Sequence, residues 1–260
     1  MAAIPDTVEK PLISVVLTTR DRPRFLAIAL RCYAAQTYPH RELIVVDDVA
    51  SFPADEAAIA ALGGRVVRVP HGWSIGAKLN AGVAEARGGI CQKMDDDDWY
   101  APRFLETMIG RRLDRQHDVC LPLVTFVMPF LFFDLAAWEI RRSVDLNAPG
   151  ATLMFDRDDW EERPFRDLAR DEDVWFFHDH ALRGAQPNPV DDLEIFLAVR
   201  HQGVTGDRSH TWTHQHGRLT LEEYLQSRPL HARQPADLLP AWALDAYRGL
   251  RAGMLPQELP

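Results

Sequence analysis

The sequence predicts an α/β fold in which a mostly parallel, doubly wound sheet carries helices on both faces. A β-branched run at 12–18 precedes apolar residues at helical spacing over 25–33, and a second β-branched run follows at 42–48. A strand–helix–strand unit of this kind implies a parallel pair with a right-handed crossover. Polar residues follow both strands, at the sheet edge where open parallel sheets bind ligands.

The remaining elements of the first half follow from their apolar pattern and their breakers. A short helix at 54–62 is closed by a glycine pair, and a strand at 65–70 ends at a proline. A helix at 79–86 is again stopped by two glycines. A strand at 90–94 and a helix at 102–113 complete this half.

The second half has a less regular pattern. We expect strands within 120–134, an ambiguous segment at 138–143, a strand at 150–155, a short helix from residue 158, an apolar helix at 174–177 and a last strand at 195–201. The sequence contains no internal repeat.

Bulk composition limits the function classes. A chain of 260 residues can bury one full core, with room for a small appendage, and 47% hydrophobic content is ordinary for a soluble globular protein. The net charge of -9, without a long basic block, argues against a nucleic-acid partner. Three scattered cysteines indicate a reducing cytosol, so we expect a cytoplasmic protein. We also expect no signal peptide and no transmembrane segment.

Four consecutive carboxylates follow the strand at 90–94: Asp95, Asp96, Asp97 and Asp98. Crowded carboxylates destabilise the fold unless a cation neutralises them, and oxygen ligands favour Mg²⁺ or Mn²⁺. If the run continues the strand, Asp95 and Asp97 point one way and the other two point away. One pair then holds a metal, while the other meets a ribose or caps the next helix. The alternative is a solvated acidic turn with Asp98 as a helix N-cap.

Further polar residues are expected at the same edge of the sheet, where the first two strands end: Thr18, Thr19, Arg20, Asp47 and Asp48. For the two aspartates the alternative is helix capping or turn formation. Lys78 lies in the first turn of the third predicted helix, where a cation opposes the helix dipole. Its position is reasonable if an anion also binds there, although a solvent-exposed lysine is the simpler alternative.

Four landmarks in this order, at 14–22, 43–48, 78–82 and 95–102, resemble the nucleotide-sugar domain of the inverting GT-A glycosyltransferases, specifically glycosyltransferase family 2. The resemblance covers residues 11–113 and returns near Asp171. It implies a GT-A fold that binds a nucleoside diphosphate sugar, with UDP as the default nucleotide, together with Mn²⁺ or Mg²⁺.

The resemblance also implies roles for residues of the first half. Thr18, Thr19 and Arg20 hold the nucleoside, Asp48 meets the base with Asp47 beside it, and Lys78 faces the diphosphate. The D-x-D motif falls on Asp95 and Asp97 when Pro102 is used as the anchor. Asp97 is then the best metal ligand, and Asp95 or Asp96 contacts the ribose, with Asp95 a second candidate metal ligand.

In the second half, the acidic pair Glu172 and Asp173 before an apolar helix matches the family segment that supplies the catalytic base. By that match Asp173 is the base and Glu172 is the neighbouring candidate. The alternative is a helix start capped by Asp171 or Asp173. His201 ends the last strand and would contact the metal or the diphosphate, although the asparagine that often follows in the family is missing here.

The expected domain organisation is a GT-A catalytic domain at 1–217 followed by a C-terminal helical tail at 218–260. Residues 11–113 form the nucleotide-sugar-binding half, and 114–217 form the half that binds the acceptor and carries the base. Histidines 210, 214 and 216 are expected in a flap or acceptor surface. The tail is either a contact in a homodimer or a loose arm.

The expected function is inverting transfer of a sugar to an acceptor hydroxyl, on a saccharide or another hydroxyl compound. A nucleotidyltransferase on the same fold is a second hypothesis. Such enzymes usually bind the triphosphate with a glycine-rich, basic loop after the first strand, and residues 19–23 contain no glycine. A non-catalytic protein that binds nucleotide sugars is the third.

Overall fold

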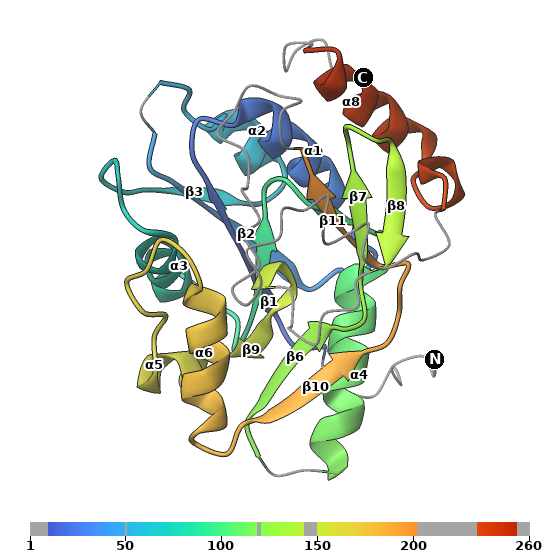
Figure 1. The fold of residues 1–260 in the computed structure, drawn as a ribbon. Helices are drawn as coiled ribbons and strands as arrows, with labels where there is room; N and C mark the ends of the chain where they lie inside the picture. The colour runs from blue at the N-terminus through green and yellow to red at the C-terminus, as the bar shows by residue number, and fades with distance from the viewer. Residues whose placement is uncertain (1–9, 50, 119–120, 143–149, 202–232, 254–260) are drawn as a thin grey trace.

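The computed structural model describes residues 10–49, 51–118, 121–142, 150–201 and 233–253 (Figure 1). The main sheet has seven strands in the order β10-β6-β9-β4-β1-β2-β3. These strands are β1 (Ile13–Thr19), β2 (Arg41–Asp47), β3 (Arg65–Arg68), β4 (Ile90–Asp95), β6 (Leu123–Val127), β9 (Met154–Asp156) and β10 (Gln186–Val190). A smaller sheet contains β5 (Trp99–Tyr100), β11 (Phe196–Arg200), β7 (Leu131–Asp134) and β8 (Glu139–Arg142) in that order.

The helices connect these strands in the alternation that the sequence predicts. They are α1 (Pro23–Ala34), α2 (Glu56–Ala61), α3 (Ile75–Ala84), α4 (Phe104–Asp118), α5 (Arg157–Glu162), α6 (Glu172–Ala181) and α8 (Ala241–Arg251). Short 3₁₀ turns are found at η1 (Gly150–Thr152) and η2 (Pro235–Asp237). In the described part of the chain no helix is long and apolar enough to cross a membrane.

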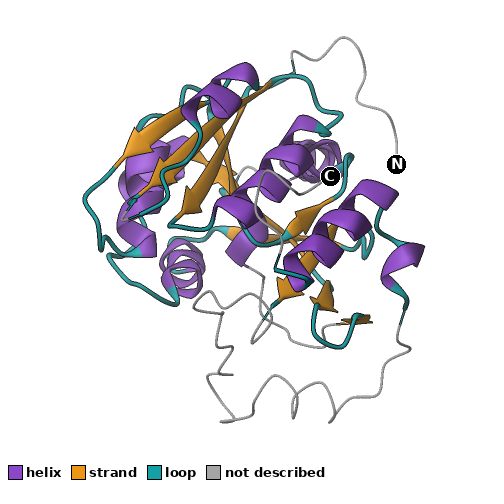
Figure 2. Ribbon diagram, turned by 90° about the horizontal axis from the view of Figure 1, so that it is seen from above, coloured by secondary structure: helices purple, strands orange, loops and turns teal. Residues whose placement is uncertain are grey.

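Helices cover both faces of the main sheet (Figure 2). On β1, Val15 and Leu17 pack with α1 and α4 in one core cluster, while Val16 packs with α3 and α6 in the other. Side chains that alternate along a strand point to opposite faces, so this split shows that β1 is buried from both sides. The predicted doubly wound α/β architecture is confirmed.

The order of the strands reverses direction in the middle of the sheet, at β1. From β1 the chain moves outward to β2 and β3, then returns to β4 on the other side of β1, and all these strands run parallel. The connections from β1 and from β3 run in opposite directions along the sheet, and open α/β sheets commonly bind ligands at the carboxyl ends of the strands at such a point. Thr18 and Asp95 lie opposite each other in the β1–β4 register, so both strands end at this edge.

Two local predictions differ from the structure. The predicted strand at 150–155 begins as the 3₁₀ turn η1, and only the short antiparallel β9 follows it. Strand β10 was not predicted because its sequence, QPNPV, contains two prolines. It is tolerated because β10 is an edge strand that pairs with β6 alone, and edge strands accommodate proline.

Candidate functional site

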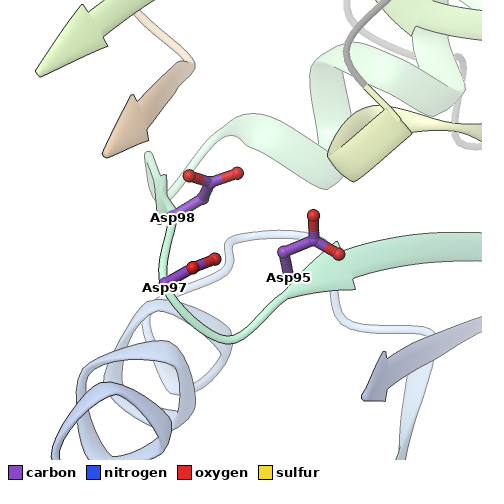
Figure 3. Close-up of side chains that lie close together, drawn as sticks. All are labelled: Asp95, Asp97 and Asp98. Carbon is purple, nitrogen blue, oxygen red and sulfur yellow. The ribbon is translucent and has the colours of Figure 1, made fainter. Parts of the chain in front are cut away.

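The acidic run turns sharply at the end of β4. The strand ends at Asp95, the next residues form a bend, and β5 begins at Trp99. Asp95, Asp97 and Asp98 therefore face one another, with one carboxylate oxygen of each within 4.8 Å of the others (Figure 3). The expected strand alternation was right in pairing Asp95 with Asp97 and wrong in turning Asp98 away. A strand also follows Asp98, which therefore caps no helix.

The three carboxylates fit a hard divalent cation. All the donors are oxygens, and Asp97 and Asp98 are buried, so the run is not a solvated turn. Burial, reinforced by the neighbouring Asp97, raises the pKa of Asp98 well above its ordinary value. Burial likewise raises the pKa of Asp96 to about 6, although Arg22 opposes the shift. A cation bound by the three would offset the energetic cost of keeping these side chains ionised.

Protein cations and a histidine already hold parts of the acidic run. The guanidinium of Arg22 lies 2.7 Å from Asp97 and 2.8 Å from Asp96. Thr19 Oγ1 donates to Asp96 at 2.7 Å, which ties the tip of β1 to the run. His201 Nε2 lies 3.2 Å from Asp97 Oδ2 at the end of β11. The structure thus places His201 beside one of the three carboxylates.

A second cluster forms around Asp48, just after β2. Lys78 Nζ donates to Asp48 at 2.9 Å and Arg20 Nε donates at 2.6 Å, while the Gly72 amide approaches at 3.3 Å. Burial raises the pKa of Asp48, but the bonds from Arg20 and Lys78 lower it more, so the net shift is downward. Lys78 also reaches the carbonyl of Thr19 at 3.4 Å, so this cluster adjoins the tip of β1.

Asp47 does not join the Asp48 cluster. Its carboxylate accepts from the Ala54 amide at 2.8 Å and pairs with Arg68 on β3. Adjacent residues at a strand end project to opposite sides, which separates Asp47 from Asp48. In this structure Asp47 organises the β2–α2 loop.

Lys93 connects the acidic run to the start of α6. Its Nζ donates to Asp95 Oδ1 at 2.8 Å and lies 3.8 Å from Glu172 Oε1. Burial lowers the pKa of Lys93, but Asp95, Glu172 and Asp173 raise it more, so this buried lysine is charged. Burial also raises the pKa of Glu172 to about 7; Lys93 opposes the shift, and Asp173 and Asp95 reinforce it.

Asp173 lies beside Glu172 in the first turn of α6. It is partly exposed, and its Oδ1 accepts from the Val174 amide at 2.8 Å. Its carboxylate packs against Gly150 so closely that a Cβ on Gly150 would meet Asp173 Oδ2 at 1.8 Å. Asp171 occupies the N-cap position with a φ of 62°, but its side chain makes no capping hydrogen bond. Among the described contacts, capping by Asp171 is therefore absent, and Asp173 remains accessible.

The raised pKa of Glu172 predicts a pH-dependent stability. A carboxyl whose pKa is 4.5 when unfolded and about 7 when folded stabilises the fold fully below pH 4.5, and this contribution is lost as the pH rises to 7. Glu172→Gln should therefore flatten the pH dependence of the free energy of unfolding between about pH 4.5 and 7, by roughly 1–3 kcal/mol. Urea unfolding of the wild type and of Glu172→Gln at several pH values in this range gives the free energy of unfolding of each protein. The same pH dependence in both proteins would contradict the prediction.

Comparisons with known proteins identify the family. The family model described as glycosyl transferase family 2 matches residues 14–166, which is more than half of the chain. The chain belongs to glycosyl transferase family 2.

Curated relatives match part of this family 2 chain. An uncharacterized glycosyltransferase of Rickettsia bellii is 30% identical over 102 residues, which cover 38% of this chain and 15% of that protein. The uncharacterized glycosyltransferase YwdF of Bacillus subtilis is 33% identical over 97 residues, covering 37% of this chain and 36% of that protein. The chain therefore spans well under half the length of these relatives.

Solved structures share the GT-A fold. The mannosyltransferase PcManGT of Pyrobaculum calidifontis, in complex with GDP-Man and Mn²⁺, superposes with a TM-score of 0.59 at 17% identity, over 81% of this chain and 62% of that chain. S. aureus TarS 1–349, in complex with UDP-GlcNAc, gives a TM-score of 0.58 at 18% identity, over 74% and 59%. At this identity the likeness concerns the fold.

The structure adds three residues that the sequence reasoning did not assign to the site: Arg22 and Lys93 contact the acidic run, and Gly150 packs against Asp173. It also places Asp98, which was expected to point away from Asp95 and Asp97, in the same oxygen cluster as these two residues. The contact of Lys93 with Asp95 could have been predicted from the sequence, because a lysine two residues before an aspartate on a strand lies on the same face of the strand as that aspartate. The predicted histidine flap at 210, 214 and 216 lies outside the described residues.

Proposed function

We propose that this family 2 domain is a metal-dependent, inverting glycosyltransferase that moves a sugar from a nucleoside diphosphate sugar to an acceptor hydroxyl. The observation that carries the proposal is a series of contacts along one sheet edge. Asp48 bonds Lys78, Lys78 reaches the Thr19 carbonyl, and Thr19 bonds Asp96. From the neighbouring Asp95 the series continues through Lys93 to Glu172, beside Asp173. The proposed donor-binding groups and the candidate base thus lie along one edge of the sheet.

The donor side suits a diphosphate. Lys78 lies in the first turn of α3, whose N-terminus attracts anions, and Arg20 adds a second cation. When bound by Asp95, Asp97 and Asp98, a divalent cation would neutralise charge on the departing diphosphate. The complexes of PcManGT with GDP-Man and Mn²⁺ and of TarS with UDP-GlcNAc support a donor of this class. UDP is the default nucleotide by resemblance.

The acceptor side needs one group that removes a proton. In the proposed reaction Asp173 accepts the proton of the acceptor hydroxyl, whose oxygen attacks the anomeric carbon as the bond to the diphosphate breaks. A single displacement from the face opposite the leaving group inverts the anomeric configuration. The partial exposure of Asp173 lets an acceptor reach it, and the helix amide holds its carboxylate in place.

A product assay tests the proposed function. The full chain is incubated with UDP-, GDP- and dTDP-sugars and Mn²⁺, with a panel of saccharide acceptors and with water as the default acceptor. Release of nucleoside diphosphate with an inverted anomeric product supports the proposal. Release of pyrophosphate from nucleoside triphosphates would indicate a nucleotidyltransferase, and donor binding without any product would indicate a non-catalytic protein.

Gly150→Ala tests the position of the proposed base. The added methyl group would overlap the Oδ2, Cγ and Cβ atoms of Asp173, so the whole side chain must shift. We expect kcat to fall at least tenfold with a donor KM within about threefold, since misplacing a reacting group by about 1 Å is costly. Gly89→Ala is the matched control, because nothing lies within 4 Å of its added Cβ. Equal kcat values for Gly150→Ala and Gly89→Ala would contradict the assignment of Asp173 as the base.

A further inference from the structure

We propose that Lys93 is a positioning residue that fixes the spacing between the cation-binding Asp95 and the start of α6, which carries the base. The inference rests on the proposed function. Lys93 lies between the acidic run and the start of α6, and the proposed reaction gives it no direct contact with the reacting atoms.

The position of Lys93 on β4 makes it a link between two elements. Residues two apart on a strand share a face, so Lys93 and Asp95 project together, and Nζ lies 2.8 Å from Asp95 Oδ1. On its other side, Nζ lies 3.8 Å from Glu172 Oε1, in the first residue of α6. Lys93 is 3% exposed and Glu172 is 5% exposed, so water screens these contacts poorly.

Among the described residues, the acidic side chains at the start of α6 make few polar contacts with other elements. Asp171 sits at the N-cap without a capping hydrogen bond from its side chain, and the bond that Asp173 accepts comes from the same helix. The ion pair between Lys93 and Glu172 therefore joins this helical turn to the strand that bears Asp95. Without Lys93, the carboxylates of Asp95, Glu172 and Asp173 would lie near one another with no protein cation between them in the described part of the chain, and α6 would move to separate them.

The same geometry predicts an effect of opposite sign on the cation. Lys93 occupies Asp95 Oδ1 and places a positive charge beside the three candidate ligands. Lys93→Met removes the charge and keeps much of the side-chain volume. A cation at Asp95, Asp97 and Asp98 should then bind about tenfold more tightly. The reason is that the repulsion between the Lys93 ammonium and a cation a few ångströms away in a buried site is at least as large as the free energy of a tenfold change in affinity. A general loss of structure would weaken binding instead.

The test compares Mn²⁺ affinity and kinetics for the full chain. Mn²⁺ alone is titrated into each variant by electron paramagnetic resonance, and kcat and donor KM are measured with the donor that the product assay selects. Lys93→Met should bind Mn²⁺ about tenfold more tightly while kcat falls at least tenfold and donor KM stays within about threefold. Gln92→Met is the matched control: Gln92 is 0% exposed on the same strand, and its side chain donates to the backbone carbonyls of Lys93 and Leu153 rather than to a carboxylate of the acidic run.

Each outcome decides the proposal. Unchanged or weaker Mn²⁺ binding by folded Lys93→Met, or an unchanged kcat, would overturn it. If Lys93→Met does not fold, Lys93→Gln carries the test: the amide can still donate to Asp95, so Mn²⁺ should bind more tightly with a smaller loss of kcat, and wild-type affinity would overturn the proposal. A wild-type protein that transfers no sugar would refute the proposed function, and the Mn²⁺ comparison would still decide the role of Lys93.

Discussion

Asp173→Asn should lower kcat for sugar transfer at least a thousandfold and leave the dissociation constant of the donor within about threefold of wild type. An amide cannot accept the proton of the acceptor hydroxyl, and general base catalysis of this kind contributes about 10²–10⁴ in rate. Donor affinity should persist because the Asp173 carboxylate lies in the first turn of α6, on the far side of Lys93 and Glu172 from the acidic run. Initial rates with saturating donor, together with calorimetric titration of the nucleoside diphosphate, measure both quantities.

Asp158→Asn is the control for this substitution, because it neutralises an exposed carboxylate in the same half of the chain, on α5. It should change neither quantity. Retained turnover in Asp173→Asn with lost donor affinity would contradict the assignment of the base. In that case Glu172, which adjoins Asp173 and has a pKa near 7, would be the next group to test.

Asp97→Asn should reduce Mn²⁺ affinity at least tenfold and lower sugar transfer at least a hundredfold. Asp97 contributes one of the three converging oxygens, and an amide oxygen carries no net charge with which to hold a divalent cation. Mn²⁺ at one hundred times its wild-type dissociation constant should stabilise the wild-type fold by about 2.7 kcal/mol, and a variant that binds tenfold more weakly should lose about half of this gain at the same Mn²⁺ concentration. Thermal unfolding with and without Mn²⁺ measures the difference.

Asp47→Asn separates metal binding from the general effect of removing a buried carboxylate. Asp47 is as buried as the acidic run, but its carboxylate pairs with Arg68 and the Ala54 amide. The variant should lose stability and keep its affinity for Mn²⁺. An Asp97→Asn protein that binds Mn²⁺ as tightly as Asp47→Asn would remove Asp97 from the set of ligands.

The sequence was sufficient for the architecture because the first half obeys simple local rules. Buried β-branched runs alternate with helical spacing, and a strand–helix–strand unit has one favoured handedness. The strand ends at Thr18, Asp48 and Asp95 could therefore be placed at one edge before any coordinates were known. The proline-rich edge strand β10 could not be predicted from the sequence, because its pairing with β6 is a tertiary feature that outweighs local propensity.

Side-chain pairing within the site was less accessible to sequence reasoning. The turn after Asp95 reverses the strand alternation, and this bend is what brings Asp98 to the other carboxylates. Contacts such as Arg22 with Asp97, 75 residues apart, depend on the register of β1 against β4. The close approach of Gly150 to Asp173 depends on how α6 packs and leaves no periodic pattern in the sequence.

The most direct test of the central claim is anomalous diffraction from crystals of the full chain soaked with Mn²⁺ and UDP. We predict one Mn²⁺ peak bounded by oxygens of Asp95, Asp97 and Asp98, in contact with the diphosphate, with Lys78 facing the phosphate oxygens. A diphosphate bound elsewhere, or Mn²⁺ absent from these carboxylates at a concentration that saturates binding in solution, would contradict it.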